Sequence, residues 1–207
     1  MTAQALLPLQ GLAALLPGTR AEPEGDAVLF VPVERPPFRW NDLQRVPDDG
    51  NRYEIIDGGL LVTPPPDTEH ADIAEALRDV LRAAAPGEVA VYTSALGVDL
   101  GTAVPIPDLV AFHRRSGRRP AVDPTDILLV AEVVSPGRER VDHERKRRTY
   151  AAAGIAHYWI VDRDPIRITA LRLGAMAYTE AGRASGDELL TVTDPFPLAF
   201  RPADLLR

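Results

Sequence analysis

Short apolar runs alternate with turn-forming residues along most of the chain, and these runs have the length of β-strands. The clearest example is YEIIDGGLLVT, where two apolar segments flank a glycine turn and so predict a β-hairpin. Further strand-like segments are EVAVYTS, LGVDLG, PDLVAF, DILLVAEVVS, HYWIVD, IRITALRLG, AMAYTE and ELLTVTDPFPLAF. Because PDLVAF and DILLVAEVVS are almost continuously apolar, we expect both faces of these two strands to be covered.

Two segments have the longer periodicity of amphipathic helices. Apolar positions recur at helical spacing over residues 67–87, where Asp67 or Thr68 can cap the first turn. A second helix is predicted over about residues 138–153, ended by Gly154. Helices therefore alternate with strands, and the predicted fold class is α/β or α+β, with a central mixed sheet flanked by helices.

Residues 1–38 lack this order and are rich in Ala, Leu and Pro. We expect a loosely structured arm there, followed by a single domain over residues 39–207. The apolar start has no basic region, is interrupted by Pro8 and Pro17, and is too short to cross a bilayer. The sequence thus predicts a cytoplasmic protein that has no membrane partner.

Lysine is almost missing, because 22 of the 23 Lys and Arg residues are Arg and Lys146 is the only Lys. A GC-rich genome would produce this bias, and Lys146 would then be an accident. The alternative is a site that needs an ammonium group, whose pKa moves readily, whereas a guanidinium almost never releases its proton. The absence of Cys excludes disulfides, zinc–thiolate sites and cysteine nucleophiles.

Two carboxylates stand at unusual places in the predicted strands. Glu132 lies inside the apolar run ILLVAEVVS, where a charge is costly unless it is paired or bound to a metal. Asp108 opens PDLVAF and could simply form an Asx-type turn, as Glu132 could simply form a structural salt bridge. If the two strands pair antiparallel, both carboxylates meet on one side of the sheet. Such a pair favours a hard cation such as Mg²⁺, with the Val133 carbonyl as a further oxygen ligand.

Lys146 has acidic and aromatic neighbours at helical spacing. Asp142, Lys146 and Tyr150 form an i, i+4, i+8 stripe on the second predicted helix. One interpretation is a surface Asp–Lys pair that supports the helix. The other is that the stripe faces the strand that carries Glu132, so that Lys146 points at the metal site and stabilises charge on phosphorus.

These residues resemble the Uma2 family (formerly grouped as DUF820), bacterial proteins of the PD-(D/E)XK nuclease superfamily. The matching segments are YEIIDGGLLV, His70, IPDLVAF and VAEVVSPGRERVDHERKRRTYAAAGIAHYWIVD, within about residues 38–200. The resemblance implies a restriction-endonuclease-like fold and hydrolysis of DNA phosphodiesters with Mg²⁺ or Mn²⁺. Asp108 and Glu132 match the acidic motif residues. The superfamily lysine position is occupied by Val134 here, and Lys146 on the following helix takes its place.

The resemblance also marks accessory positions. Glu54 falls in a matching segment and could be an outer carboxylate of the metal site or part of a cross-strand surface pair. His70 could touch a phosphate or the metal shell, or be a polar residue at a helix start. Four arginines between the two core strands could grip the DNA backbone or form a solvated loop, like the basic run over residues 138–148: Arg114, Arg115, Arg118 and Arg119.

Three classes of function remain open on the sequence. The first is the metal-dependent endonuclease, with DNA as its substrate and a homodimer as the expected form. The second is a catalytically silent nuclease-fold domain that binds nucleic acid or a protein partner. The third is a self-associating structural domain, in which either Tyr158 or Trp159 lies in a dimer interface instead of filling a helix–sheet groove.

Overall fold

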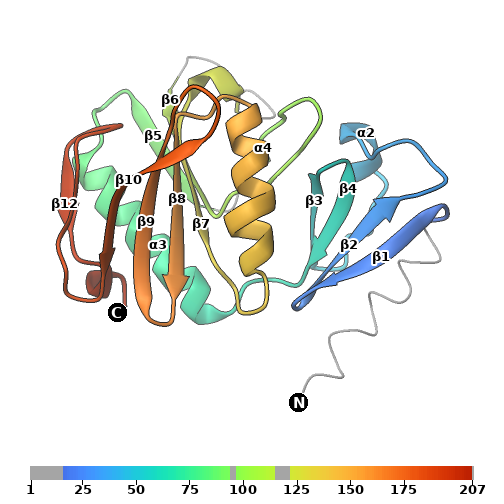
Figure 1. Cartoon of the computed structure of the whole chain (residues 1–207), viewed down its shortest axis with the longest axis horizontal. Coiled ribbons are helices and arrows are strands. Elements are labelled where there is room, and N and C mark those ends of the chain that lie inside the picture. The colour runs from blue at the N-terminus through green and yellow to red at the C-terminus, as the bar shows by residue number, and fades with distance from the viewer. Residues whose placement is uncertain (1–15, 94–96, 115–121, 207) are drawn as a thin grey trace.

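The computed structural model describes residues 16–93, 97–114 and 122–206, which form two larger β-sheets and a two-stranded one, with helices packed on them (Figure 1). The first sheet has four antiparallel strands in the order β1-β2-β4-β3. Its strands are β1 (Thr19–Glu24), β2 (Ala27–Pro32), β3 (Arg52–Ile56) and β4 (Gly59–Thr63), and the short helix α2 (Trp40–Leu43) precedes β3.

The hairpin formed by β3 and β4 confirms the prediction made from YEIIDGGLLVT. Asp57 and Gly58 form its two-residue turn, and both have positive φ, 53° and 72°. This backbone matches the twist of the flanking strands, and Asp-Gly is among the sequences that adopt it most readily. The sheet is apolar on both faces, because Phe30, Ile55 and Leu60 share one buried cluster and Leu29, Ile56 and Leu61 share another.

The prediction of a loosely structured arm over residues 1–38 is wrong for residues 19–32. These residues form β1 and β2, and β2 pairs with β4 in the register Phe30↔Leu60. The apolar run AVLFVP explains the order, because its first four residues are buried. A domain boundary at residue 38 would therefore divide a sheet, while residues 1–15 lie outside the described part of the chain.

The second sheet has six strands in the order β10-β9-β8-β7-β6-β5. These are β5 (Val89–Thr93), β6 (Leu109–His113), β7 (Ile127–Val133), β8 (His157–Arg163), β9 (Ile166–Leu173) and β10 (Tyr178–Ser185). Strands β7 and β8 are parallel and the other neighbours are antiparallel, so the sheet is mixed as predicted. The segment LGVDLG, predicted as a strand, contributes only a single bridge from Val98 to Val122.

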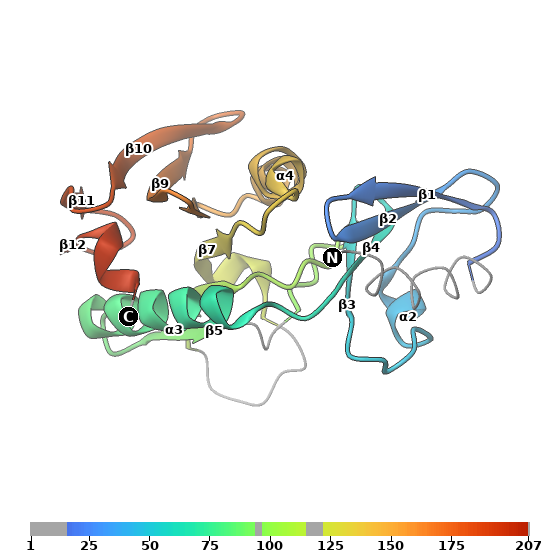
Figure 2. The ribbon, with the colours of Figure 1, turned by 90° about the horizontal axis from the view of Figure 1, so that it is seen from below.

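Helices cover both faces of the second sheet (Figure 2). Helix α3 (Thr68–Ala84) lies on one face and is capped by Asp67, whose side chain accepts from the His70 N–H. The other face carries a π-helix, η2 (Val141–Lys146), that continues into α4 (Arg147–Ala152). The chain ends in β11 (Leu190–Val192), β12 (Leu198–Phe200) and η3 (Pro202–Leu205), and η1 (Pro124–Asp126) precedes β7.

Tyr158 and Trp159 lie on opposite faces of β8, and the chain itself buries both. The Trp159 ring stacks near Phe200, with ring centroids 6.4 Å apart, and the Tyr158 ring packs against Tyr150 at 5.1 Å. Both aromatic side chains thus fill the layers between sheet and helices, which leaves neither for a dimer interface. In the described part of the chain, no helix combines the length and apolarity needed to cross a bilayer.

Candidate functional site

Four carboxylates and the single lysine meet between the two sheets. We call this group the carboxylate cluster: Glu54 on β3, Asp108 before β6, Glu132 on β7, and Asp142 and Lys146 on η2. Each of these side chains belongs to a residue that is only 1–6% exposed. The cluster is therefore enclosed by protein on all sides in this conformation.

Strand pairing brings Asp108 and Glu132 together. Strands β6 and β7 are antiparallel with Leu109 opposite Ala131, so the start of β6 lies beside the end of β7. Side chains alternate along β7, and Glu132 points to the same face as Val130 and Val134, which is the face covered by α4. The antiparallel pairing that the sequence analysis took as its condition is therefore present.

Glu54 reaches the same point from the other sheet. Ile55 exchanges two backbone hydrogen bonds with Val104, of 2.9 and 3.1 Å, which ties β3 to the segment leading into Asp108. The Glu54 carboxylate then accepts a 2.7 Å hydrogen bond from the Ile106 N–H. Glu54 is 2% exposed, so the alternative of a cross-strand surface pair is wrong.

Lys146 lies at the centre of the cluster. Its Nζ is 2.9 Å from Glu132 Oε2, 3.3 Å from Glu54 Oε1 and 3.7 Å from Asp142 Oδ1. Burial alone would lower the pKa of Lys146, but Glu132, Glu54 and Asp142 outweigh it and raise that pKa. Lys146 is thus a buried, charged ammonium, and the alternative of a surface Asp–Lys pair is wrong.

Asp108 is held by donors from three elements. Its Oδ1 lies 2.9 Å from Arg52 Nη1, and its Oδ2 lies 3.0 Å from His70 Nε2 and accepts a 3.0 Å bond from the Val133 N–H. Burial would raise the pKa of Asp108, but His70, Arg52 and Lys146 hold it well below its usual range. The N–H and C=O of a strand residue point to the same edge of the strand, so the Val133 carbonyl points to the edge of β7 on which its N–H meets Asp108.

Glu132 has the opposite electrostatic balance. Burial and the neighbouring carboxylates Asp108, Asp142 and Glu54 raise its pKa to about 8, although Lys146 opposes them. The Tyr150 hydroxyl donates a 2.6 Å hydrogen bond to Glu132 Oε1. The pKa of Asp142 is raised to about 6, again by burial first, with Lys146 opposing.

The charges of the cluster favour a divalent cation. Four carboxylates face two permanent cations, Arg52 and Lys146, which leaves an excess of two negative charges when all are ionised. Mg²⁺ needs only one or two carboxylates, because it keeps several of its waters. Within the described residues no three acidic or His side chains converge into a complete ligand set, so a metal here would depend on such waters. The carboxylate oxygens are of the type that Mg²⁺ accepts, while Lys146 Nζ lies among three of them in this conformation.

Comparisons with known proteins identify the family. The model of the Uma2 family, described as "Putative restriction endonuclease", matches residues 40–205. The chain belongs to the Uma2 family. A crystal structure of a "putative nuclease belonging to DUF820" from Anabaena variabilis superposes with a TM-score of 0.65 at 17% identity, covering 82% of this chain and 98% of that one. This likeness confirms the predicted fold, while no curated protein matches the chain.

In this Uma2 chain, two site residues escaped the sequence analysis. Arg52 precedes Glu54 by two positions on β3, and residues two apart share a face of a strand, which was the available signal. Ser135 lies 3.4 Å from His70 Nδ1 and accepts from Arg138 Nη2. His70 is thus a buried link between Ser135 and Asp108, and not merely a polar residue at a helix start.

The remaining predicted site residues of this Uma2 chain differ in whether they lie in the carboxylate cluster. Tyr150 and Asp142 lie in the cluster, as the helical stripe predicts. Arg114 is exposed and follows the far end of β6, about 20 Å along the strand from Asp108 at about 3.3 Å per residue. The structure therefore does not bring Arg114 to the cluster, and the other three arginines of that loop lie outside the described residues.

Proposed function

We propose that the chain is a Mg²⁺-dependent endonuclease that hydrolyses DNA phosphodiester bonds, with Mn²⁺ as a substitute metal. The observation that supports this most is the convergence of Asp108, Glu132 and Lys146 in one buried cluster. The resemblance to PD-(D/E)XK nucleases assigns phosphodiester hydrolysis to this acidic pair and lysine, and the matching family model is described as "Putative restriction endonuclease". The excess negative charge of the cluster agrees with a site that binds a divalent cation.

Each residue has a role that follows from its contacts. Asp108 and Glu132 would hold the metal, with the Val133 carbonyl on the same side. Bound Mg²⁺ would supply a water of lowered pKa and neutralise charge on the phosphate. Lys146 stays protonated because its carboxylate neighbours raise its pKa, so it stabilises charge on phosphorus and does not act as a base.

Tyr150 and Asp142 support this arrangement from the helix. The Tyr150 hydroxyl fixes the direction of the Glu132 carboxylate, and Asp142 lies within 3.7 Å of Lys146. Arg52 and His70 do the same for Asp108. We further expect two copies of the chain to act together on duplex DNA, which sedimentation of the free protein and of its DNA complex would show.

The test combines metal binding with cleavage. Mg²⁺ and Mn²⁺ are titrated by calorimetry into the wild type and into Asp108→Asn, and supercoiled plasmid is then incubated with each protein. The expected result is binding and nicking by the wild type and neither by Asp108→Asn. Asp187→Asn is the matched control, since Asp187 is exposed beyond β10 and should leave both unchanged. Absence of metal binding by the folded wild type would overturn the proposal.

One observation favours the second candidate, a silent domain that binds nucleic acid or a protein partner. The oxygens of Asp108 and Glu132 already contact Arg52, His70, Lys146 and Tyr150, so these two carboxylates have protein partners without a metal. Plasmid binding that persists in chelator, with no nicking in any divalent metal, would favour this candidate over the nuclease.

A further inference from the structure

The turn between β1 and β2 packs against the segment that follows the Glu132 strand. Figures 1 and 2 show this turn beside the loop that leads from β7 into η2. We call residues 22–26 the hairpin tip, and it carries three carboxylates: Glu22, Glu24 and Asp26. We call the facing side chains of the loop and of η2 the arginine cluster: Arg138, Arg140 and Arg145.

Every member of the arginine cluster is paired with the tip. Glu24 Oε1 lies 2.5 Å from Arg140 Nη2 and 3.2 Å from Arg145 Nη2. Arg145 also lies 3.7 Å from Glu22, and Arg138 Nε lies 3.1 Å from Asp26 Oδ1. Glu24 and Arg145 form the buried part of this contact, with side chains 5% and 16% exposed, while Asp26 and Arg140 are about half exposed.

Backbone packing supports the same contact. Gly25 has φ +65°, and a Cβ added to it would lie 2.6 Å from the carbonyl carbon and oxygen of Gly137. Only glycine at position 25 permits the two backbone segments to approach so closely. The tip and the loop are therefore shaped to each other.

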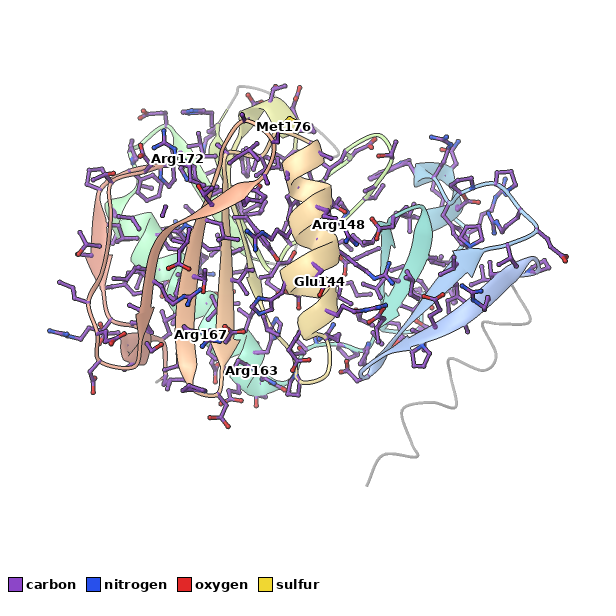
Figure 3. The ribbon with its side chains drawn as sticks, in the orientation of Figure 1. Glu144, Arg148, Arg163, Arg167, Arg172 and Met176 are labelled. Atoms are coloured by element: carbon purple, nitrogen blue, oxygen red, sulfur yellow. The ribbon has the colours of Figure 1, made fainter. Side chains whose placement is uncertain are left out.

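The arginine cluster is connected to the carboxylate cluster. Arg138 donates to Ser135 Oγ, Ser135 contacts His70 Nδ1, and His70 Nε2 contacts Asp108. The arginine surface continues toward the β3–β4 turn, where Arg145 lies 3.0 Å and Arg148 3.8 Å from Asp57. Figure 3 shows Arg148 on the flank of α4 that faces the first sheet. A cavity of about 500 Å³ is lined in part by Asp57 and Arg148.

Arginine is the side chain best suited to phosphate, because its planar guanidinium donates two parallel hydrogen bonds to an anionic oxygen pair. The tip offers carboxylates to the same donors, so it occupies the position that phosphates would take. The tip also belongs to β1 and β2, which precede the residues matched by the family model.

We propose that the arginine cluster is the surface that binds the DNA phosphate backbone, and that the hairpin tip occupies this surface and keeps the site closed until phosphates displace it. This inference rests on the proposed function, because it takes DNA as the substrate. It also accounts for the enclosure of the carboxylate cluster: a polymer enters only when the first sheet, which carries Glu54, moves away with the tip.

The test removes the charges of the tip and keeps its shape. The variant Glu22→Gln/Glu24→Gln/Asp26→Asn is compared with the wild type by fluorescence anisotropy on a labelled duplex, in chelator and over a range of salt. We expect DNA affinity to rise about tenfold or more at low salt. The plot of log affinity against log salt should also steepen, because in the wild type salt weakens the tip–arginine ion pairs that oppose DNA binding and so offsets part of the loss.

A matched control changes the net charge equally at a different place on the molecule. The triple variant Glu88→Gln/Glu180→Gln/Asp187→Asn alters exposed carboxylates in or next to β5 and β10, the two edge strands of the second sheet, away from the β7–η2 loop that the tip contacts. This control variant should show the same slope of log affinity against log salt as the wild type. Equal affinity and slope in the tip variant and this control would overturn the inference, since the tip would then be only structural.

Two further measurements keep the result unambiguous. Asp26→Asn alone removes the most exposed tip contact, leaves the buried Glu24 in place, and should give a smaller gain in the same direction. Adding Arg138→Gln, Arg140→Gln and Arg145→Gln to the tip variant should abolish the gain, and a gain that persists would refute the assigned surface. If the tip variant binds DNA more tightly but does not nick plasmid in Mg²⁺, the nuclease proposal is refuted and the proposed binding surface is supported.

Discussion

Replacing Lys146 by Met would show how far the carboxylate cluster depends on one ammonium group. Methionine keeps most of the length and the apolar stem of the side chain but removes its charge. Three buried carboxylates now lie 2.9, 3.3 and 3.7 Å from Nζ, and the variant would leave them facing one another. Removing one partner of a buried ion pair costs about 3–5 kcal/mol, because the remaining charge is left without compensation.

We therefore expect Lys146→Met to lower the free energy of unfolding by about 3–5 kcal/mol. Proton uptake by Glu132, whose pKa burial already raises to about 8, would bring the loss toward the lower end of this range. Adding Glu132→Gln removes one charge and keeps an oxygen that accepts from Tyr150. Because the two residues are in contact, the double variant should lose about 0.5–3 kcal/mol less than the sum of the single losses.

The measurement is urea unfolding followed by circular dichroism, in metal-free buffer, on the wild type, both single variants and the double variant. Arg148→Met is the matched control from the following helix. The Arg148 side chain is 66% exposed, and its ion pair with Asp57 is long, at 3.8 Å. It should change the free energy of unfolding by no more than about 0.5 kcal/mol. A loss for Lys146→Met that is no larger than for Arg148→Met would refute the electrostatic account of the cluster.

Two other predictions concern the tip and one half-buried ion pair. In the same urea assay, Gly25→Ala should lower the free energy of unfolding by about 1–3 kcal/mol more than Gly50→Ala. Both glycines have positive φ, but only a Cβ at position 25 would meet the Gly137 backbone. Equal losses of stability in the two variants would contradict the close packing. His143 Nε2 lies 2.9 Å from Asp162, which raises the pKa of His143, so the pair stabilises the fold below about pH 6.5 and loses this contribution as the pH rises through the raised pKa. His143→Gln should thus cost more stability at about pH 5.5 than at about pH 9, and a cost that does not change with pH would argue against the pair.

The sequence predicted the elements whose signals are local. The Asp-Gly turn marked the β3–β4 hairpin, helical spacing and the cap Asp67 marked α3, and two apolar runs marked β6 and β7. On the condition that these two runs pair antiparallel, Asp108 and Glu132 were expected at the same end of the strand pair, and the structure shows that pairing. The spacing of Asp142, Lys146 and Tyr150 predicted a shared helix face, and the structure decided between a surface pair and a face toward Glu132.

What escaped prediction depends on distant partners. Arg52 contacts Asp108 across 56 positions of sequence, and no local pattern announces such a pair. The strands β1 and β2 were hidden by a proline-rich composition. Pro23 lies in β1, which is the edge strand of its sheet, so the missing N–H costs no hydrogen bond to a neighbouring strand.

The π-helix η2 has a consequence for how the chain tolerates changes in length. A π-turn contains one residue more than the α-helical turn it replaces, and such turns are typically retained where they place side chains at functional sites. Deleting one residue within 141–146 would let the segment relax into an α-helix and turn the residues before the deletion by about 100° relative to Tyr150. A deletion between Asp142 and Lys146 would thus turn Asp142 away from the face that Lys146 and Tyr150 share. A substitution within residues 141–146 changes the contacts of one side chain, whereas deletion of one residue would rotate every residue of the helix that precedes the deletion.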